Sequence, residues 1–374
     1  MIDLCLSGGG VRAAVFHLGV LKALAEADLL GEVERISSVS GGSIVIGLLY
    51  HENNMKWPTD AEYLDGLHDK LLARFSKGGL QLAYAKRLLL NPFNWLKITA
   101  AGDVLSKTIN SFWGISEKWD DVPQRPIWSV NITSTNTGKR WRFKKGKMGD
   151  YLTGYTSTDG FKLSDVMAIS AGFPLGVGPY RLHTKKHKWH KYERELTFIK
   201  PKFKRIDLMD GGVYDNLGLD AFYDCGKRTC RCGGMENQRY IIVSDASAPL
   251  ESRPPYARWR LLSRAYRMYM ISYDQIRLLR IRTFVGSILQ GELQGMYVQL
   301  GGDPERKGRD AGFKHIPPSS QDNEDRKVVR KYGTNLGAIN KEVADSIATN
   351  SYEQTRLFIL NTYPSIAEKA DENE

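Results

Sequence analysis

One serine has the surroundings that nucleophilic chemistry requires. Ser40 lies in the segment SSVSGGS, between an expected strand from Arg35 to Val39 and an almost wholly apolar helix start from Ser43 to Tyr50. A strand that turns sharply into a helix in this way forms a nucleophile elbow, which presents the serine hydroxyl at the helix N-terminus. The turn needs small neighbours; Gly42 meets this need, whereas Ser38 stands where the usual pattern has glycine. The segment predicts a serine that attacks a carbonyl carbon, with a Gly/Ser-rich loop without chemistry as the alternative.

A second candidate is the run Gly8-Gly9-Gly10, which follows a short apolar segment and precedes a helical pattern. Consecutive glycines leave backbone N–H groups unobstructed, and the helix dipole adds positive potential. Such a loop can hold a phosphate, or the oxyanion that forms when a serine attacks an ester.

The same glycines allow a rival interpretation, because Gly8-x-Gly10-x-x-Ala13 after a strand is also a dinucleotide-binding fingerprint. That fingerprint requires an acidic residue at the end of the second strand. Here the second strand leads instead into Ser40, so the hydrolase interpretation is favoured. A P-loop is excluded because no Gly-Lys-Ser/Thr follows the glycines.

A carboxylate completes the set. Asp210 is followed by Gly211 and Gly212 and ends a mostly apolar segment. We expect it at the carboxyl end of a parallel strand, on the rim where α/β enzymes work. The glycines would let the backbone approach, so that Asp210 could reach a serine directly. A turn formed by the Asp-Gly pair, without catalysis, is the alternative.

Three blocks in this order resemble the patatin-like phospholipase family: LSGGGVRAAVFHLGVLKAL, SSVSGGS and MDGGVYDNLG. The segment LSDVMAISAGFPLGVGPY is similar to that family's Ala/Ser-rich segment beside the active site, and TNLGAINKEVADSIATNSYEQT resembles the closing segment of bacterial members.

The resemblance implies a three-layer α/β/α sandwich with a mainly parallel central sheet. It also implies a phospholipase A or lysophospholipase activity that uses a serine and an aspartate, without a catalytic histidine, metal or cofactor. Carried over by motif, the dyad is Ser40 and Asp210. The remaining roles are an oxyanion hole from Gly8, Gly9, Gly10 and Val11, and substrate contacts from Arg12, Gly41, Gly211 and Gly212. Arg12 would hold phosphate or orient the turn.

Other polar residues offer weaker alternatives. His315 is the only histidine after Asp210, so a Ser–Asp–His order is formally possible. His17 is expected to pack or hydrogen-bond, Asp215 to form a turn and Asp245 to be structural. The spacing of Cys225, Cys230 and Cys232, even with nearby histidines, is not that of a usual zinc site, so we expect reduced structural cysteines; no metal is predicted.

Strand–helix alternation over the first fifty residues predicts a parallel sheet covered on both faces. Further strands are expected at 127–133, 140–143, 205–210 and 240–245, with helices between 55 and 120 and a basic loop at 181–191. A Gly/Pro-rich charged region (301–333) precedes the last helical stretch. We expect one domain with insertions over residues 1–365 and a disordered tail at 366–374.

The net charge of +11 favours an anionic partner. Membrane phospholipids are the expected partner and substrate; neither DNA nor RNA is expected, and the sequence makes no prediction of oligomeric state. Two segments have a composition that suits either contact with a membrane surface or packing in the core. One is the aromatic, basic stretch from Leu88 to Lys97, and the other is a basic helix from Arg258 to Arg282 with the stripe Leu262, Tyr266, Tyr269, Tyr273 and Ile276.

The start MIDLCLSGGG lacks the basic and long apolar regions of a signal peptide, and no apolar run reaches the roughly 18 residues needed to span a bilayer. A cytoplasmic protein, peripheral at the inner membrane face, is expected. Some bacterial patatin-like proteins are antiphage effectors activated by cyclic nucleotides, so the resemblance also allows a cyclic nucleotide activator.

Overall fold

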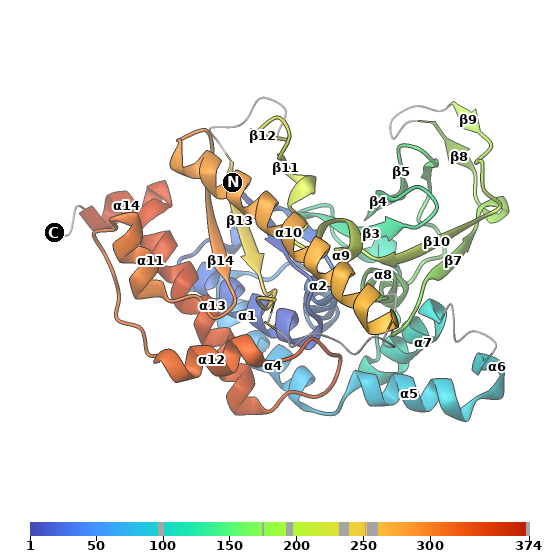
Figure 1. The fold of residues 1–374 in the computed structure, drawn as a ribbon, viewed down its shortest axis with the longest axis horizontal. Coiled ribbons are helices and arrows are strands. Elements are labelled where there is room, and N and C mark those ends of the chain that lie inside the picture. Colours follow the sequence, from blue (N-terminus) through green and yellow to red (C-terminus); the bar gives the residue numbers. More distant parts are fainter. Residues whose placement is uncertain are drawn as a thin grey trace.

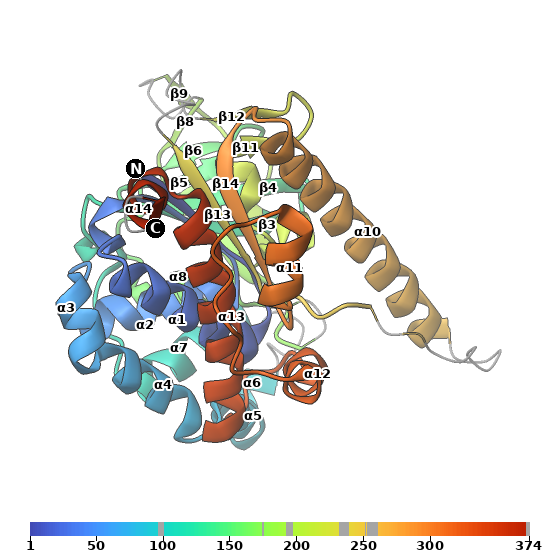
Figure 2. The same ribbon diagram turned by 90° about the vertical axis from the view of Figure 1, so that its left-hand side faces the viewer.

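The computed structural model of the chain describes residues 1–95, 101–173, 176–191, 197–231, 239–250, 252 and 261–371 (Figures 1 and 2). Five neighbouring strands form its parallel centre, in the order β14 (Gln294–Gln299), β13 (Tyr240–Asp245), β1 (Ile2–Leu6), β2 (Val33–Ser38) and β3 (Ile127–Ser134). Every residue of β1 and β13 is buried, which is why both read as near-continuous apolar runs.

The sheet continues beyond β3 with antiparallel strands. These are β4 (Lys139–Lys144), β5 (Lys147–Asp150), β6 (Gly154–Thr156), β8 (Trp189–His190) and β9 (Phe198–Ile199). A further strand, β10 (Arg205–Asp210), pairs antiparallel with both β3 and β7 (Tyr180–His183). The expectation of a loop over 181–191 is therefore wrong, because β7, a short 3-10 turn (Thr184–Lys186) and β8 together occupy most of it.

Helices cover both faces of the sheet, so the expected three-layer α/β/α architecture is confirmed. Figure 2 shows the sheet between α10 (Leu261–Leu289) and a layer that contains α1 (Gly10–Glu26), α2 (Gly41–Glu52), α8 (Leu163–Ser170) and α13 (Lys341–Thr362). Alternate residues of β1 serve the two faces: Leu4 and Leu6 belong to the large core under α1, whereas Cys5 packs in a smaller cluster with Phe284 of α10.

The stretch between β2 and β3 is helical, as expected (Figure 1). Its elements are α3 (Asp60–Glu62), η2 (Tyr63–Leu67), α4 (His68–Ser76), α5 (Leu80–Leu90), α6 (Pro92–Trp95) and α7 (Gly102–Trp113). No helix among the described residues is long and apolar enough to cross a bilayer.

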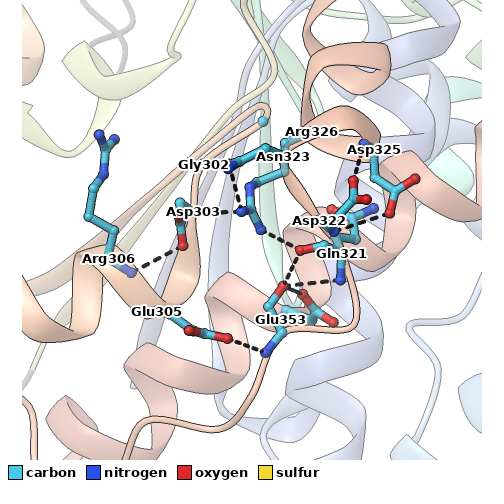
Figure 3. Close-up of polar contacts among 12 residues, drawn as sticks. Gly302, Asp303, Glu305, Arg306, Gln321, Asp322, Asn323, Asp325, Arg326 and Glu353 are labelled. Atoms are coloured by element: carbon cyan, nitrogen blue, oxygen red, sulfur yellow. Dashed lines mark hydrogen bonds and ion pairs between the residues drawn. The ribbon is translucent and has the colours of Figure 1, made fainter.

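Polar contacts join α11 (Pro304–Ala311) and α12 (Asn323–Lys331) to α13, as Figure 3 shows. Arg326 of α12 forms an ion pair with Asp303, the N-cap of α11, at 3.5 Å. Glu353 of α13 accepts a hydrogen bond from the Ser320 N–H at 2.7 Å. These contacts order the charged 301–333 region. The expected tail is also more regular than predicted, since α14 (Pro364–Asp371) is helical.

Candidate active site

The turn at Ser40 has the strained backbone of a nucleophile elbow. Ser40 has φ 50° and ψ −114° at the N-cap of α2, a region that residues other than glycine rarely occupy. Its N–H donates to the Ser170 hydroxyl at 3.0 Å, which fixes the turn to the end of α8. A Cβ on Gly42 would lie 2.6 Å from the Leu6 carbonyl oxygen, so this position requires glycine. The structure therefore has the expected elbow, with a serine side chain that is 8% exposed.

Ser38, the departure from the usual elbow pattern, is accommodated by hydrogen bonds. Its buried hydroxyl accepts from the Trp128 indole N–H at 2.8 Å and lies 2.9 Å from the Ser43 hydroxyl. A buried hydroxyl without partners would be costly, and these contacts remove that cost. The Ser38 side chain thus takes part in the packing around the elbow.

Asp210 reaches Ser40 by a different route from the one expected. The prediction of a parallel strand is wrong, because β10 runs antiparallel to β3, with Asp210 opposite Ile132. The strand β2 is parallel to β3 and ends with Ser38 opposite Val130. β4 pairs with the other edge of β3 along Val130–Ser134. β2 and β10 therefore lie along the same edge of β3, and their carboxyl ends face each other. This head-to-head arrangement brings Asp210 level with Ser40, two residues past the end of β2.

The Asp210 carboxyl is buried and its basicity is increased. Burial raises its pKa from 3.8 to about 6, opposed by hydrogen bonds from the Gly212 N–H and from the Ser40 side chain. The Gly212 N–H donates to Oδ1 at 2.7 Å. The Ser40 side chain is therefore near enough to the Asp210 carboxyl to affect its pKa, and the aspartate is a stronger base than a solvated carboxylate.

The Gly-rich loop lies beside Ser40, but two of its N–H groups are already engaged. The Gly8 N–H donates to the Asn216 carbonyl at 3.0 Å, and the Val11 N–H donates to the Asn335 carbonyl at 2.9 Å. Gly9 and Gly10, with φ 148° and 64°, keep N–H groups that have no acceptor within the described part of the chain. Of the four positions expected in the oxyanion hole, the structure leaves Gly9 and Gly10 available.

The Arg12 guanidinium is engaged by contacts within the chain. Its side chain is buried and donates to the carbonyls of Ala246 and Tyr332 and to the Thr334 hydroxyl. Burial lowers its pKa to about 10. Arg12 ties the Gly-rich loop to the segment before α13, so of the two roles expected for it, orienting the turn is the one that fits.

The three glycines expected to touch substrate allow backbones to approach closely. A Cβ on Gly41 would lie 2.2 Å from the Gly10 carbonyl oxygen, and one on Gly211 would lie 2.3 Å from the Asn131 carbonyl oxygen. A Cβ on Gly212 would lie 3.0 Å from Asp210 Oδ1. Their positions are thus explained by packing around the dyad.

Sequence reasoning missed Asn216, which joins the two loops of the site. Its side-chain N–H₂ group donates to the Gly8 carbonyl at 3.3 Å and to the Ser247 hydroxyl at 2.9 Å. It also missed Ser170, whose hydroxyl donates to the Asn131 carbonyl at 3.0 Å. Both residues lie inside segments that carry the family resemblance, so their motifs were visible although their contacts were not.

His17 and His315 form hydrogen bonds with residues other than the dyad. His17 is buried, with its ring nitrogens 2.7 Å from the Ser244 hydroxyl and 2.9 Å from the Ser7 carbonyl oxygen, and burial lowers its pKa to about 4. The expectation that it packs and hydrogen-bonds is confirmed. His315 pairs through its backbone with the Asn361 side chain. Thr362, the residue after Asn361, contacts Tyr240 at the amino end of β13. His315 therefore lies near the amino ends of the parallel strands, whereas Ser40 follows the carboxyl end of β2.

The competing carboxylates are structural, as expected. Asp215 accepts from the Leu217 and Asp220 N–H groups, and Asp245 forms a buried ion pair with Arg277. Cys230 is disulfide-bonded, so the expectation of reduced cysteines is wrong there; Cys225 is a free thiol, and Cys232 lies outside the described residues. Within the described ranges, no group of three potential metal ligands occurs.

Comparison with known proteins identifies a family and a fold. The family model described as patatin-like phospholipase matches residues 4–223, a stretch that includes the Gly-rich loop, Ser40 and Asp210. No curated protein sequence matches the chain at a significant level.

Solved structures with a similar fold include two of human GIVD cytosolic phospholipase A2. One has a TM-score of 0.55 at 13% sequence identity and covers 99% of this chain and 60% of the human one. The other, in complex with methyl gamma-linolenyl fluorophosphonate, has a TM-score of 0.52 at 14% identity and covers 100% and 58%. This chain thus spans about 60% of the human chain, and the likeness supports the fold assignment.

Proposed function

The chain belongs to the patatin-like phospholipase family, and we propose that it is a serine acyl hydrolase that cleaves fatty-acyl esters of membrane phospholipids. The observation that carries this proposal is the strained turn at Ser40 beside a buried Asp210 whose pKa is raised to about 6. A carboxylate with this pKa is ionised at neutral pH and is a better base than an ordinary aspartate.

In the proposed first half-reaction, the Ser40 hydroxyl attacks the ester carbonyl carbon while Asp210 accepts its proton. The carbonyl oxygen becomes an oxyanion, which the N–H groups of Gly9 and Gly10 at the start of α1 would stabilise. The C–O bond to glycerol then breaks, and the departing alkoxide takes the proton from Asp210. The products of this step are a lysophospholipid and an acyl group on Ser40.

In the second half-reaction, a water attacks the acyl-Ser40 carbonyl and Asp210 accepts the proton of that water. Collapse of this second oxyanion releases the fatty acid and returns the proton to Ser40. The mechanism uses no metal or cofactor.

We propose peripheral membrane contact through the α5–α6 patch, defined as Leu89, Leu90, Phe93 and Trp95. These four side chains are exposed, Phe93 by 80%, and Lys86 and Arg87 precede them. Leu88 packs partly against the core, while Leu96 and Lys97 lie outside the described residues. A hollow of about 430 Å³ beside the patch is lined by Lys86, Arg87 and Leu90, among others, and is separate from the dyad.

Fatty-acid release from phospholipid vesicles, measured in the presence of EDTA, tests this function. Wild-type protein should release fatty acid, and the Ser40→Ala variant should release none above background. The expected alternative, a nucleotide-activated effector, remains a prediction; adding cyclic dinucleotides to the same assay tests it.

A further inference from the structure

Helix α10 has two unlike sides. The side toward the sheet carries Tyr266, Tyr269 and Tyr273, whose rings follow one another with centroids 6.4 and 5.9 Å apart. About three turns after Tyr273 the same side carries Phe284, which is fully buried against the sheet. Tyr269 and Tyr273 of the stripe expected from the sequence are thus partly buried, whereas Leu262, Tyr266 and Ile276 of that stripe are exposed.

Two ion pairs hold the middle of α10 at the rim of the sheet. Arg277 pairs with Asp245, at the end of β13, at 2.6 Å, and both side chains are buried. Arg280 pairs with Asp215 at 3.1 Å. Asp215 ends α9 (Gly212–Asp215), the short helix that begins two residues after Asp210. The helix is therefore attached to the same loop that positions the catalytic carboxylate.

The inner tyrosines lie close enough to Asp210 for its charge to act on them. The pKa of Tyr269 is raised to about 12, first by burial and then by Asp210, and the same two causes raise that of Tyr273. A small hollow of about 100 Å³ between α9 and α10 is lined by residues that include Gly212, Asn216 and both tyrosines. The inner side of α10 thus forms a wall beside the dyad.

The opposite side of α10 is exposed, with three apolar side chains lying between two arginines. Its residues follow helical spacing and form what we call the outer stripe: Arg264, Met268, Ile271, Gln275, Leu279 and Arg282. Met268 is 69% exposed, Ile271 43% and Leu279 58%. With a rise of about 1.5 Å per residue, the stripe is roughly 27 Å long. Large aliphatic side chains in a row on the surface mark an interaction site.

We propose that the outer stripe of α10 inserts into the head-group region of an anionic phospholipid surface. The helix would lie in the plane of the membrane, with Met268, Ile271 and Leu279 at the acyl boundary and the two arginines among the phosphates. The net charge of +11 favours the same surface. Pairing with a second copy fits less well, because a two-fold axis would bring the arginine ends of one stripe against those of the other.

The choice of a lipid surface as the binding partner of α10 rests on the proposed function, which this inference makes more specific. The inner side of α10 walls the dyad and its outer side would lie in the membrane, so an ester leaving the bilayer would have only the thickness of one helix to pass. The structure thus assigns α10, in addition to the α5–α6 patch, as a membrane-contacting element.

The test is a vesicle-binding measurement on the full chain carrying Ser40→Ala, so that no lipid is consumed. The probes are phosphatidylcholine vesicles with and without phosphatidylglycerol. We expect binding to require phosphatidylglycerol, and Met268→Gln/Ile271→Gln/Leu279→Gln should weaken it at least about tenfold. Glutamine keeps helix propensity and charge unchanged. The matched control is Val328→Gln, which changes a similarly exposed aliphatic residue on α12 and should leave binding as it was.

A second variant keeps the test decisive if the triple variant folds poorly: Arg264→Gln/Arg282→Gln should weaken binding and reduce its salt dependence. Unchanged binding in the variants that fold would overturn the proposal. A parent protein that is dimeric in gel filtration, with the triple variant monomeric, would overturn it in favour of a second copy. If binding depends on the stripe but wild-type protein releases no fatty acid, the proposed function fails while this inference stands.

Discussion

Ser40 and Asp210 meet on one edge of β3 because their two strands approach it from opposite directions. β2 ends opposite Val130 and β10 ends opposite Ile132, so the carboxyl ends of the two strands face each other. The residue that turns out of β2 and the residue that closes β10 are thereby placed side by side at the interior of the sheet. Burial of Asp210 follows from this arrangement, and with it the raised pKa.

The first prediction distinguishes Asp210 from His315 as the proposed general base. Asp210→Asn should lower kcat/KM by at least about a hundredfold, the size of effect typical for loss of a general base. His315→Ala should change kcat/KM by less than about twofold, because His315 lies near the amino ends of the parallel strands, away from Ser40. The reverse pattern in ester hydrolysis assays would argue for a Ser–Asp–His triad.

The second prediction is a pH profile. Asp210 must be ionised to accept a proton, so kcat/KM should fall tenfold per pH unit below a pH of about 6. An unaltered rate between pH 4 and 5, measured on a soluble ester, would exclude Asp210 as the base; both values lie on the acid side of its pKa of about 6.

The same pKa shift has a consequence for stability. The folded-state pKa of about 6 lies above the ordinary 3.8, so the protonated form favours folding. That contribution is complete below the unfolded pKa and is lost as pH rises through about 6, at a cost of roughly 3 kcal/mol. Asp210→Asn should therefore raise Tm at pH 8 relative to wild type, with a smaller gain at pH 5. A Tm difference that does not depend on pH would contradict a buried, titrating Asp210.

The third prediction concerns Arg12. Lysine cannot reproduce the three donated hydrogen bonds that join Arg12 to Ala246, Tyr332 and Thr334. Arg12→Lys should lower the free energy of unfolding by roughly 2–4 kcal/mol, as measured by urea denaturation. A normal unfolding free energy together with a raised KM for phospholipid would instead indicate that Arg12 binds the phosphate of the substrate.

The fourth prediction concerns the α5–α6 patch. Phe93→Ser/Trp95→Ser should reduce activity on anionic vesicles several-fold, because exposed aromatic side chains favour the membrane interface. Activity on a soluble short-chain ester should be spared, since neither residue contacts the dyad. Leu152→Ser, at another exposed apolar side chain, serves as control. Equal losses on both substrates would show that the patch supports the fold and does not contact lipid.

The sequence predicted local features well and long-range partners poorly. The elbow at Ser40 was predictable because its turn depends on neighbouring residues. The engagement of the Gly8 and Val11 N–H groups was not, because their acceptors belong to Asn216 and Asn335, far along the chain. The apolar pattern of β10 was visible, yet the same pattern suits a strand of either direction, so the antiparallel pairing of Asp210 could not be deduced. Likewise the outer stripe of α10 could be identified only from the structure, in which Tyr269 and Tyr273 lie on the inner side of the helix.

The most direct test of the Ser40–Asp210 account is covalent trapping with an alkyl fluorophosphonate, which reacts with activated serine hydroxyls. Peptide mapping by mass spectrometry after treatment of the wild-type chain should show one adduct, on Ser40. The adduct should be absent in Ser40→Ala and form at least about a hundredfold more slowly in Asp210→Asn, because the base that accepts the serine proton is lost. An adduct on another residue, or equal rates of Ser40 labelling in the wild type and Asp210→Asn, would contradict the dyad.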